Sequence, residues 1–408
     1  MSDDSSCVSF SCRPSFYADV EEATWCDWRW QQRSLVHSTA QLEDIYPGFA
    51  EVFSVHAAEW RRRSLRFGIT PYLLSLVRVD EQGLPDSADP IFRQFFPVFE
   101  ELTDVPIALR RRPVESEARW VAEERERPGE SLTPICHWTY DHRVTIDSSD
   151  RCLAYCTFCV RSLRADAVEQ KTGGLAIWRE TMEAIRARPA IREVVLSGGE
   201  PLAYSNLRLG QMLRDLRRIP SVRTIEIHTR ALTHNPYRVD DELCALFRRY
   251  GVSKVGAHIV HPAELSPELR AAVSRVRELS TKTAVASHHV VVKGVNDDDA
   301  VLRELFTRLS SLGVRPQVLF HMMPDTPAPS SQRTSLRRTV HLFNLLRAHV
   351  STDAMPELAL AHDLGALSVP PDPEGTPSFR YLEDPGGQPT VRFKDRRGEW
   401  TEYLDAVD

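Results

Sequence analysis

From about residue 144 onward, short runs of β-branched and apolar residues recur along the chain, with helix-like segments between them. The runs lie at residues 144–146, 193–196, 224–227, 254–259, 284–292 and 317–320. A spacing of roughly thirty residues or somewhat more is typical of a repeated strand–helix unit. Six or so such units predict an α/β fold, a partial (β/α)6-type barrel, with functional sites at the carboxyl ends of its strands.

Two of the intervening segments carry clear helix signals. Asp240 is a plausible N-cap for a helix that ends at Gly251, a residue that tolerates the left-handed conformation of a helix end. The segment after residue 205 has the i, i+3, i+4, i+7 pattern of an amphipathic face, formed by Leu209, Met212, Leu213 and Leu216.

The strand–helix region divides the chain into three predicted parts. Residues 1–140 form a mainly helical N-terminal extension, in which Trp25, Trp28 and Trp30 favour core packing. Residues 141–365 form the partial barrel. Residues 366–408 are rich in Pro and Gly and predict a short C-terminal arm with a hairpin around residues 390–393.

Composition and charge exclude several functional classes. With 42% hydrophobic and 26% charged residues, the chain resembles an ordinary globular protein. Its 51 basic and 57 acidic residues give a net charge of −6, which argues against a nucleic-acid partner. The sequence has no apolar run of membrane-spanning length, and its start lacks the regions of a signal peptide. We therefore expect a cytoplasmic protein with no membrane partner.

Three of the eight cysteines, Cys152, Cys156 and Cys159, are spaced C-x3-C-x2-C. A structural zinc site normally has four ligands, and a second Cys or Cys/His pair at zinc spacing is missing here. A disulfide framework is disfavoured because eight cysteines in 408 residues are sparse. Electron-transfer clusters usually take four cysteines, so this triplet favours an iron–sulfur cluster whose fourth iron is open for reaction.

The stretch from residue 196 to 201, Leu-Ser-Gly-Gly-Glu-Pro, follows one predicted strand and precedes a helix-like segment. Its two glycines allow the backbone to approach a ligand closely, and the carboxylate of Glu200 can accept a hydrogen bond from an ammonium group. Alone, this motif is also consistent with an ordinary turn.

Together these motifs resemble the radical S-adenosylmethionine (SAM) enzymes, whose signature is C-x3-C-x2-C with an aromatic residue, here Phe158, before the last cysteine. The resemblance implies that Cys152, Cys156 and Cys159 hold a [4Fe–4S] cluster and that SAM chelates its open iron. Phe158 would lie against the adenine. The stretch that would hold the SAM amino group consists of Ser197, Gly198, Gly199 and Glu200.

Further segments resemble lysine 2,3-aminomutase and its relatives in order and rough spacing, namely residues 25–30, 69–72, 141–144, 258–262, 294–297 and 314–316. The resemblance implies that Arg161 binds the carboxylate of an amino-acid substrate. It implies SAM contacts for His258 and His288, and contacts to a cofactor phosphate for Arg143 and Arg230. A homo-oligomer and a reductant such as a flavodoxin or ferredoxin are also implied.

The sequence departs from this family where the family carries its pyridoxal phosphate (PLP). The aminomutases have a Schiff-base lysine near the end of the barrel, whereas this chain has no lysine between Lys293 and Lys394. Trp138 stands in place of a phosphate-binding arginine, and Met323 in place of an aspartate that binds the distal amine of lysine. Asp325 is then the nearest candidate for a substrate contact, and PLP is doubtful.

We therefore expect a radical SAM enzyme that abstracts hydrogen from an amino acid or a derived metabolite, in a PLP-independent rearrangement, epimerisation or related radical reaction. An epimerase would need a hydrogen donor, for which Cys136 is the candidate by default. A PLP-dependent 2,3-aminomutase and a non-catalytic iron–sulfur sensing protein are the alternatives.

Overall fold

The computed structural model describes residues 13–62, 67–96, 131–159, 174–323, 330–362, 365–383, 387–395 and 398–407. Its centre is a ten-stranded sheet in which each strand pairs with its neighbours in chain order. The strands are β1 (Ser131–Thr133), β2 (Cys136–Tyr140), β3 (Arg143–Ser149), β4 (Glu193–Gly198), β5 (Thr224–Thr229), β6 (Lys254–His258), β7 (Ala284–Val290), β8 (Arg315–His321), β9 (Glu357–His362) and β10 (Gly365–Ser368).

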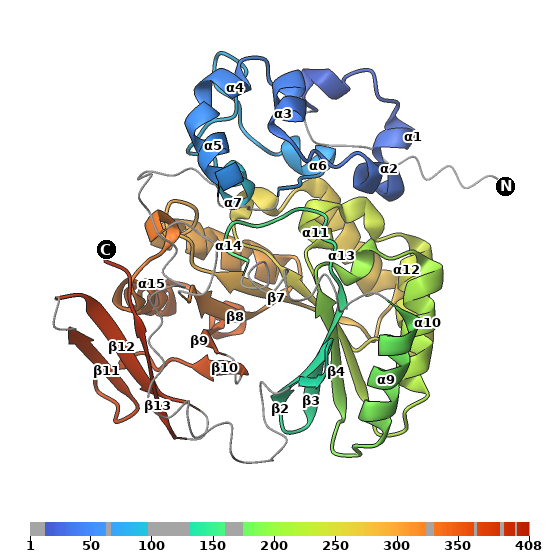
Figure 1. Cartoon of the computed structure of the whole chain (residues 1–408), viewed down its shortest axis with the longest axis vertical. Helices are drawn as coiled ribbons and strands as arrows, with labels where there is room; N and C mark the ends of the chain where they lie inside the picture. Colours follow the sequence, from blue (N-terminus) through green and yellow to red (C-terminus); the bar gives the residue numbers. More distant parts are fainter. Residues whose placement is uncertain are drawn as a thin grey trace.

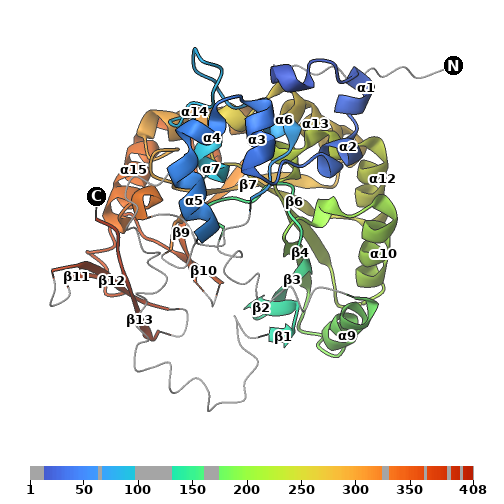
Figure 2. The ribbon, with the colours of Figure 1, turned by 45° about the horizontal axis from the view of Figure 1, so that its top comes forward.

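The sheet curls into a partial barrel. Strands β3 to β9 run parallel, whereas β1, β2 and β10 add antiparallel strands at the two edges. The two edges face each other across the concave side without pairing in the described residues (Figures 1 and 2). The predicted partial barrel and all six predicted strands are confirmed, and the sequence reasoning missed β1, β2, β9 and β10.

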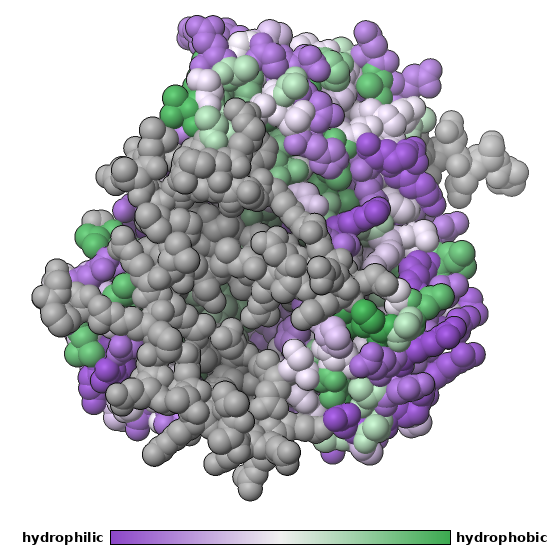
Figure 3. Space-filling view, viewed as in Figure 1, coloured by the Kyte–Doolittle hydropathy of each residue, from purple (hydrophilic) through white to green (hydrophobic). Residues whose placement is uncertain are grey.

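Helices cover the convex side of the sheet (Figure 1). They are α9 (Leu175–Arg186), α10 (Asn206–Arg217), α12 (Asp241–Tyr250), α13 (Pro267–Leu279), α14 (Asp299–Ser311) and α15 (Leu336–His349). Between strands and helices lie the shorter α11 (Ala231–His234), η5 (Pro201–Ala203), η6 (Pro236–Arg238), η7 (Pro262–Glu264), η8 (Ser330–Gln332) and η9 (Thr352–Ala354). The surface over α9, α10 and α12 is mainly hydrophilic, as expected for amphipathic helices whose apolar faces pack on a sheet (Figure 3).

The predicted helix signals are confirmed. The Asp240 side chain caps α12 by accepting from the Leu243 backbone N–H at 2.7 Å, and Gly251 ends the helix in the left-handed region with φ 59°. The predicted apolar face of α10 is buried, through Leu209, Met212, Leu213 and Leu216.

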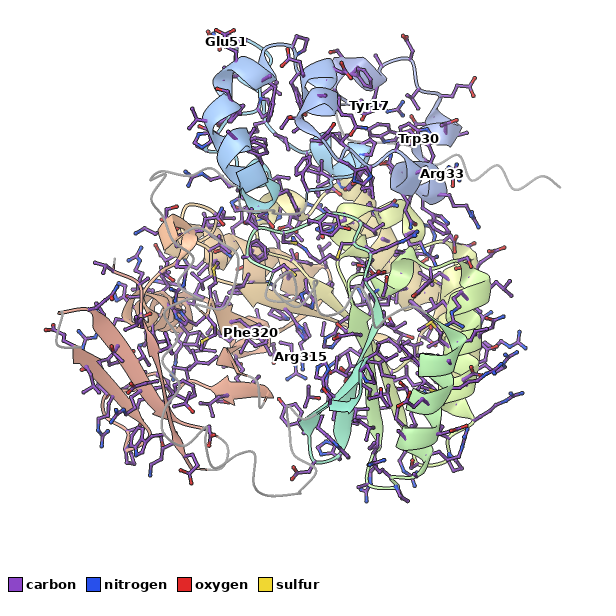
Figure 4. All side chains as sticks on the ribbon, in the orientation of Figure 1. Tyr17, Trp30, Arg33, Glu51, Arg315 and Phe320 are labelled. Carbon is purple, nitrogen blue, oxygen red and sulfur yellow. The ribbon has the colours of Figure 1, made fainter. Side chains whose placement is uncertain are left out.

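The N-terminal part is a helical layer over one end of the barrel (Figure 1). It contains η1 (Ser15–Tyr17), α1 (Glu22–Trp25), α2 (Trp28–Arg33), α3 (Thr39–Ile45), α4 (Phe49–Val52), α5 (Ser54–Arg62), α6 (Pro71–Leu74) and α7 (Phe92–Phe95). The tryptophan cluster packs in its core. Trp25 is fully buried, and the rings of Tyr17 and Trp30 lie 6.1 Å apart (Figure 4).

The C-terminal part forms a separate three-stranded antiparallel sheet of β11 (Phe379–Glu383), β12 (Pro389–Lys394) and β13 (Trp400–Leu404), so the predicted hairpin exists and gains one strand. Asp405, just after β13, accepts a hydrogen bond from the Leu336 backbone N–H at 2.8 Å and so joins this sheet to the start of α15. The division into parts at residues 140 and 365 stays a prediction. No helix of the described residues has the length and apolarity that crossing a membrane requires.

Candidate active site

The cysteine loop, residues 150–159, leaves the carboxyl end of β3 and lies against the N-terminal helical layer. The Tyr155 backbone N–H donates to the Gly68 carbonyl at 2.9 Å, and the Thr157 backbone N–H donates to the Gln94 carbonyl at 2.8 Å. The Thr157 hydroxyl also donates to Oε1 of Gln332 at 2.8 Å. The loop is therefore held by elements from three regions of the chain. Its three cysteines, Cys152, Cys156 and Cys159, form no disulfide and are partly exposed.

The Gly198–Gly199 pair brings the end of β4 against the start of this loop. Gly198 has φ +112°, and a Cβ there would lie 2.6 Å from the Ser149 carbonyl oxygen. A Cβ on Gly199 would overlap the Arg151 carbonyl. The close approach that the glycines permit is thus to the backbone of the cysteine loop. The preceding Ser197 is nearly buried, and its carbonyl accepts from the Ser148 hydroxyl at 2.8 Å.

Glu200 is buried and accepts three hydrogen bonds from the protein. The donors are the Leu202 N–H at 2.9 Å, the Thr229 hydroxyl at 2.6 Å and the Arg230 N–H at 2.8 Å. Burial raises the pKa of this carboxyl group, and the hydrogen bonds oppose that rise. Glu200 therefore joins the ends of β4 and β5, in addition to any contact with the SAM amino group that the resemblance implies.

Arg230 is the residue that connects β5 to the cysteines. Its guanidinium donates to Sγ of Cys156, to Oε1 of Gln94 and to Oε2 of Glu264, each at 2.9 Å. It also lies 5.7 Å from the centroid of the Phe158 ring. Burial raises the pKa of the Cys156 thiol, and the Arg230 charge opposes that rise, so the guanidinium favours the thiolate that a metal cluster requires.

Three histidines from consecutive strands meet inside the barrel: His228 on β5, His258 on β6 and His288 on β7. Their ring centroids are 4.6 Å apart for His228 and His288, 5.2 Å for His258 and His288, and 6.0 Å for His228 and His258. Gly256 makes room for the His228 ring, since a Cβ at that position would lie 2.8 Å from Cδ2 of His228. Burial lowers the pKa of both His228 and His288, which keeps these rings neutral.

On the neighbouring strand β8 (Arg315–His321), Arg315 and Phe320 are labelled in Figure 4. The Phe320 ring lies 6.3 Å from that of His288. Sequence reasoning selected His258 and His288 but missed His228. Finding His228 would have required the register of β5 and β6, because His228 pairs with Gly256 across these two strands.

A buried charged network lies beside the histidines. Oε2 of Glu226 is 2.7 Å from a guanidinium nitrogen of Arg143, 3.0 Å from Nζ of Lys254 and 3.3 Å from Nε2 of His228. Lys254 also donates to Oε1 of Gln317 at 3.0 Å. Burial alone would raise the pKa of Glu226, but the His228 hydrogen bond and the two positive charges lower it to about 2. Arg143, expected to hold a cofactor phosphate, is thus bound to a protein carboxylate, and sequence reasoning missed Glu226, Lys254 and Gln317.

The remaining predicted residues are placed differently. Cys136 on β2 is buried among core side chains, and its burial raises the pKa of the thiol to about 12. The charge that acts on it is that of Arg188, just after α9, so its surroundings differ from those of the cysteine loop. Arg161 and Asp325, predicted to contact substrate, lie outside the described residues.

Comparisons with known proteins agree with this geometry. The family model described as the Radical SAM superfamily matches residues 146–306. L-lysine 2,3-aminomutase of Acetoanaerobium sticklandii is 28% identical over 371 residues, which cover 88% of this chain and 81% of that protein. A putative L-lysine 2,3-aminomutase of Aquifex aeolicus is 29% identical over 357 residues, covering 87% and 90%. Glutamate 2,3-aminomutase of Clostridioides difficile is 24% identical over 352 residues, covering 86% and 77%.

These comparisons support a radical SAM enzyme that is similar to the lysine 2,3-aminomutases over most of its length. The family implies a [4Fe–4S] cluster and SAM, and the cysteine loop of this radical SAM enzyme fits them. Three cysteines that form no disulfide lie on one loop at the carboxyl ends of the strands, and the Arg230 guanidinium offsets part of the negative charge that three thiolates introduce.

PLP fits the described residues of this radical SAM enzyme poorly. The β9–β10 hairpin, the segment where the resemblance to the aminomutases would place the Schiff-base lysine, has no lysine in this sequence. Lys254 lies at the other end of the barrel, at the start of β6, and is bound to Glu226. Arg143 and Arg230, which would hold the phosphate, are bound to Glu226 and Glu264.

Proposed function

We propose that this enzyme abstracts a hydrogen atom from an amino acid or an amino-acid-derived substrate and catalyses a PLP-independent rearrangement, epimerisation or related radical reaction. When bound, the cluster and SAM supply the 5′-deoxyadenosyl radical for that step. The observation that carries the proposal is the cysteine loop at the carboxyl edge of the parallel strands, with Arg230 bonded to Cys156 and the histidines inside the barrel.

The residues of the chain have separate tasks in this proposal. Cys152, Cys156 and Cys159 hold the cluster, and Arg230 fixes the middle thiolate through a charge-assisted N–H···S hydrogen bond. Phe158 lies beside Arg230, and its contact with the adenine of SAM remains a prediction from the family resemblance. Arg161 and Asp325 remain the predicted substrate contacts, and a flavodoxin- or ferredoxin-type reductant remains the predicted electron source. The homo-oligomer is likewise a proposal.

Amino-acid rearrangement is supported by the names of the relatives, which act on lysine or glutamate. Those relatives also support a second candidate, a PLP-dependent 2,3-aminomutase. The commitment of Arg143 and Arg230 to buried carboxylates argues against it. Without PLP, a 1,2-amino shift lacks the conjugated imine through which a substrate radical passes easily, so reactions that leave the nitrogen in place are favoured.

The decisive experiment measures 5′-deoxyadenosine and product from the anaerobically reconstituted protein with SAM, reductant and a panel of amino acids, with and without PLP. We expect substrate-dependent 5′-deoxyadenosine that PLP does not change. Cys156→Ala should lose cluster iron and SAM cleavage, whereas Cys26→Ala, which removes a thiol outside the loop, should retain both. SAM cleavage by Cys156→Ala would refute the cluster assignment, and turnover only with PLP would favour the aminomutase.

A further inference from the structure

We infer that His228, His258 and His288 form a binding site for a divalent transition-metal ion inside the barrel, separate from the cysteine cluster. One ring nitrogen from each histidine lies within 4.8 Å of the other two. Imidazole is the ligand that Zn²⁺, Co²⁺, Ni²⁺ and Fe²⁺ all accept. Three histidines with an open fourth position are also the ligand set of one type of catalytic zinc site.

The pairing of the strands brings the three histidines together. His258 and His288 are direct partners in the β6–β7 ladder, so their side chains project to the same side of the sheet. His228 pairs with Gly256, two residues before His258, and the missing side chain of that glycine leaves space for the His228 ring. Three adjacent parallel strands therefore each contribute one imidazole to the same point.

The spacing of the rings is close to what an ion requires. An ion about 2.1 Å from each of three nitrogens in a tetrahedral site separates those nitrogens by about 3.4 Å. From the present upper limit of 4.8 Å the nitrogens therefore need to approach by about 1.4 Å at most, which small side-chain rotations supply. The rings are tilted or perpendicular to one another, at 52° to 87°, so no pair is stacked face to face.

The surrounding groups supply an outer shell. Glu226 lies 3.3 Å from Nε2 of His228, and Oε1 of Gln317 lies 3.4 Å from Nε2 of His288. Carboxylate and amide oxygens commonly orient metal-binding histidines in this way. In this arrangement His228 binds the metal ion through its other ring nitrogen, Nδ1. If it binds the ion through Nε2, the Glu226 carboxylate lies close enough to become a fourth ligand.

The charges around the site indicate what the ion would bind. Arg143 and Lys254 both face Glu226, and Arg143 also lies 3.8 Å from Glu193, so these four groups carry no net charge beside the three imidazoles. An added divalent cation makes the region positive, and an anionic group in the open position of the ion lowers that charge again. We therefore expect the metal ion to bind a carboxylate in its open position, such as that of an amino-acid substrate. This last step rests on the proposed function, whereas the metal site does not.

The test uses the full chain with Cys152, Cys156 and Cys159 all replaced by alanine, which removes the thiolates that would also bind metal. After treatment with a chelator, this protein is titrated with Co²⁺ and Zn²⁺. We expect one equivalent of Co²⁺ with visible d–d absorption and displacement by Zn²⁺. His228→Ala, His258→Ala and His288→Ala should each weaken binding by about 100-fold or more, at least the loss seen when an outer-shell partner is removed.

His142→Ala is the matched control, since His142 is exposed on the β2–β3 turn and should leave the affinity unchanged. X-ray absorption of the Zn²⁺-bound parent gives a result that does not depend on any histidine variant folding, and it should show nitrogen ligands at about 2.0–2.1 Å and no sulfur.

No binding, or binding that survives all three alanine variants, would overturn the inference. Loss of SAM affinity in His258→Ala without any Co²⁺ binding would return these residues to SAM alone. Neither result depends on SAM cleavage, so this inference and the proposed function fail separately.

Discussion

At the scale of single residues, the Arg230 side chain joins three separate segments of the candidate site. Its two terminal guanidinium nitrogens donate to a thiol, an amide and a carboxylate that come from the cysteine loop, α7 and η7. Glu264 is almost fully buried, so the guanidinium also neutralises a charge that would otherwise be costly inside the protein.

We predict that Arg230→Gln destabilises the protein by about 3–5 kcal/mol, because it leaves the buried Glu264 carboxylate without its positive partner. The amount of iron bound per chain should also fall, since the Cys156 thiolate loses its hydrogen-bond donor. Arg230→Lys should be intermediate, because one ammonium cannot reproduce the planar fork. Thermal unfolding and iron per chain measure both effects. Wild-type values for Arg230→Gln would show that the contacts of Arg230 contribute nothing to the site.

Glu226 predicts how stability depends on pH. Its pKa is lowered to about 2 in the folded protein from an ordinary value of 4.5. The stabilisation is therefore complete above pH 4.5 and is lost as the pH falls toward 2. Glu226→Gln should cost about 3–5 kcal/mol at pH 7, because Arg143 and Lys254 lose their shared carboxylate.

Unfolding of wild type and Glu226→Gln between pH 7 and 3 checks this prediction. We expect the difference between the two proteins to shrink as the pH falls below about 4.5, where the wild-type carboxylate begins to lose its advantage. Glu374→Gln is the control, because Glu374 pairs with Arg337 on the exposed surface and should change stability by less than about 1 kcal/mol. A difference that stays constant with pH would contradict the role given to Glu226.

At the scale of elements, the junction of β4 with the cysteine loop depends on residues without side chains. Gly199→Ala would place a methyl group against the Arg151 carbonyl, and Gly198→Ala would add backbone strain at φ +112° to a similar contact. Overpacking of this kind typically costs about 1–3 kcal/mol.

We predict that Gly199→Ala and Gly198→Ala lower both unfolding stability and the iron bound per chain, because the displaced loop carries the cysteines. Gly83→Ala is the control that separates backbone strain at a glycine from displacement of the cysteine loop. Gly83 has φ +79° but no atom within 4 Å of the added methyl, so it should cost only the left-handed strain of about 1–2 kcal/mol and leave the iron unchanged. Full iron content in Gly199→Ala would mean that the contact does not position the cysteines.

β9 shows why one element escaped prediction. Its residues, Glu357–His362, include no β-branched side chain, so their intrinsic preference for a strand is weak. Leu358 and Leu360 are nevertheless buried, and β9 pairs along β8 in parallel register. The core and the neighbouring strand therefore outweigh local propensity.

At the scale of the whole molecule, the C-terminal sheet is joined to the barrel through Asp405. This buried carboxylate accepts from the Leu336 backbone N–H at the first turn of α15 and lies 3.7 Å from Nε2 of His321. An acidic side chain at a helix N-terminus is favourable because of the exposed N–H groups there.

We predict that Asp405→Ala destabilises the protein by about 1–3 kcal/mol, the usual cost of leaving a buried donor unsatisfied. The C-terminal sheet should also become more accessible to limited proteolysis near residues 370–378. Glu374→Ala, which removes an exposed ion pair between the same two parts, should leave the digestion pattern unchanged. Equal digestion of Asp405→Ala and wild type would show that the sheet is held by its apolar contacts alone.

The sequence by itself determined the features that depend on local pattern and spacing. The six strands, the cap at Asp240, the end of α12 at Gly251 and the cysteine triplet all follow from neighbouring residues, whose preferences agree with the final fold. The family resemblance also came from such short segments. What residues do within one turn or one loop can be read before the chain is folded.

Only the tertiary structure decided which distant residues meet. Arg230, expected to hold a phosphate, is bound to Cys156 and Glu264. The glycines after β4 pack on the cysteine loop, and Glu226 joins Arg143 to Lys254. His228 meets His258 and His288 because of strand register, which depends on pairing across the sheet and leaves no trace in local sequence. The chemistry of the site therefore depends on contacts between strands that lie about thirty residues apart, a spacing typical of strand–helix units.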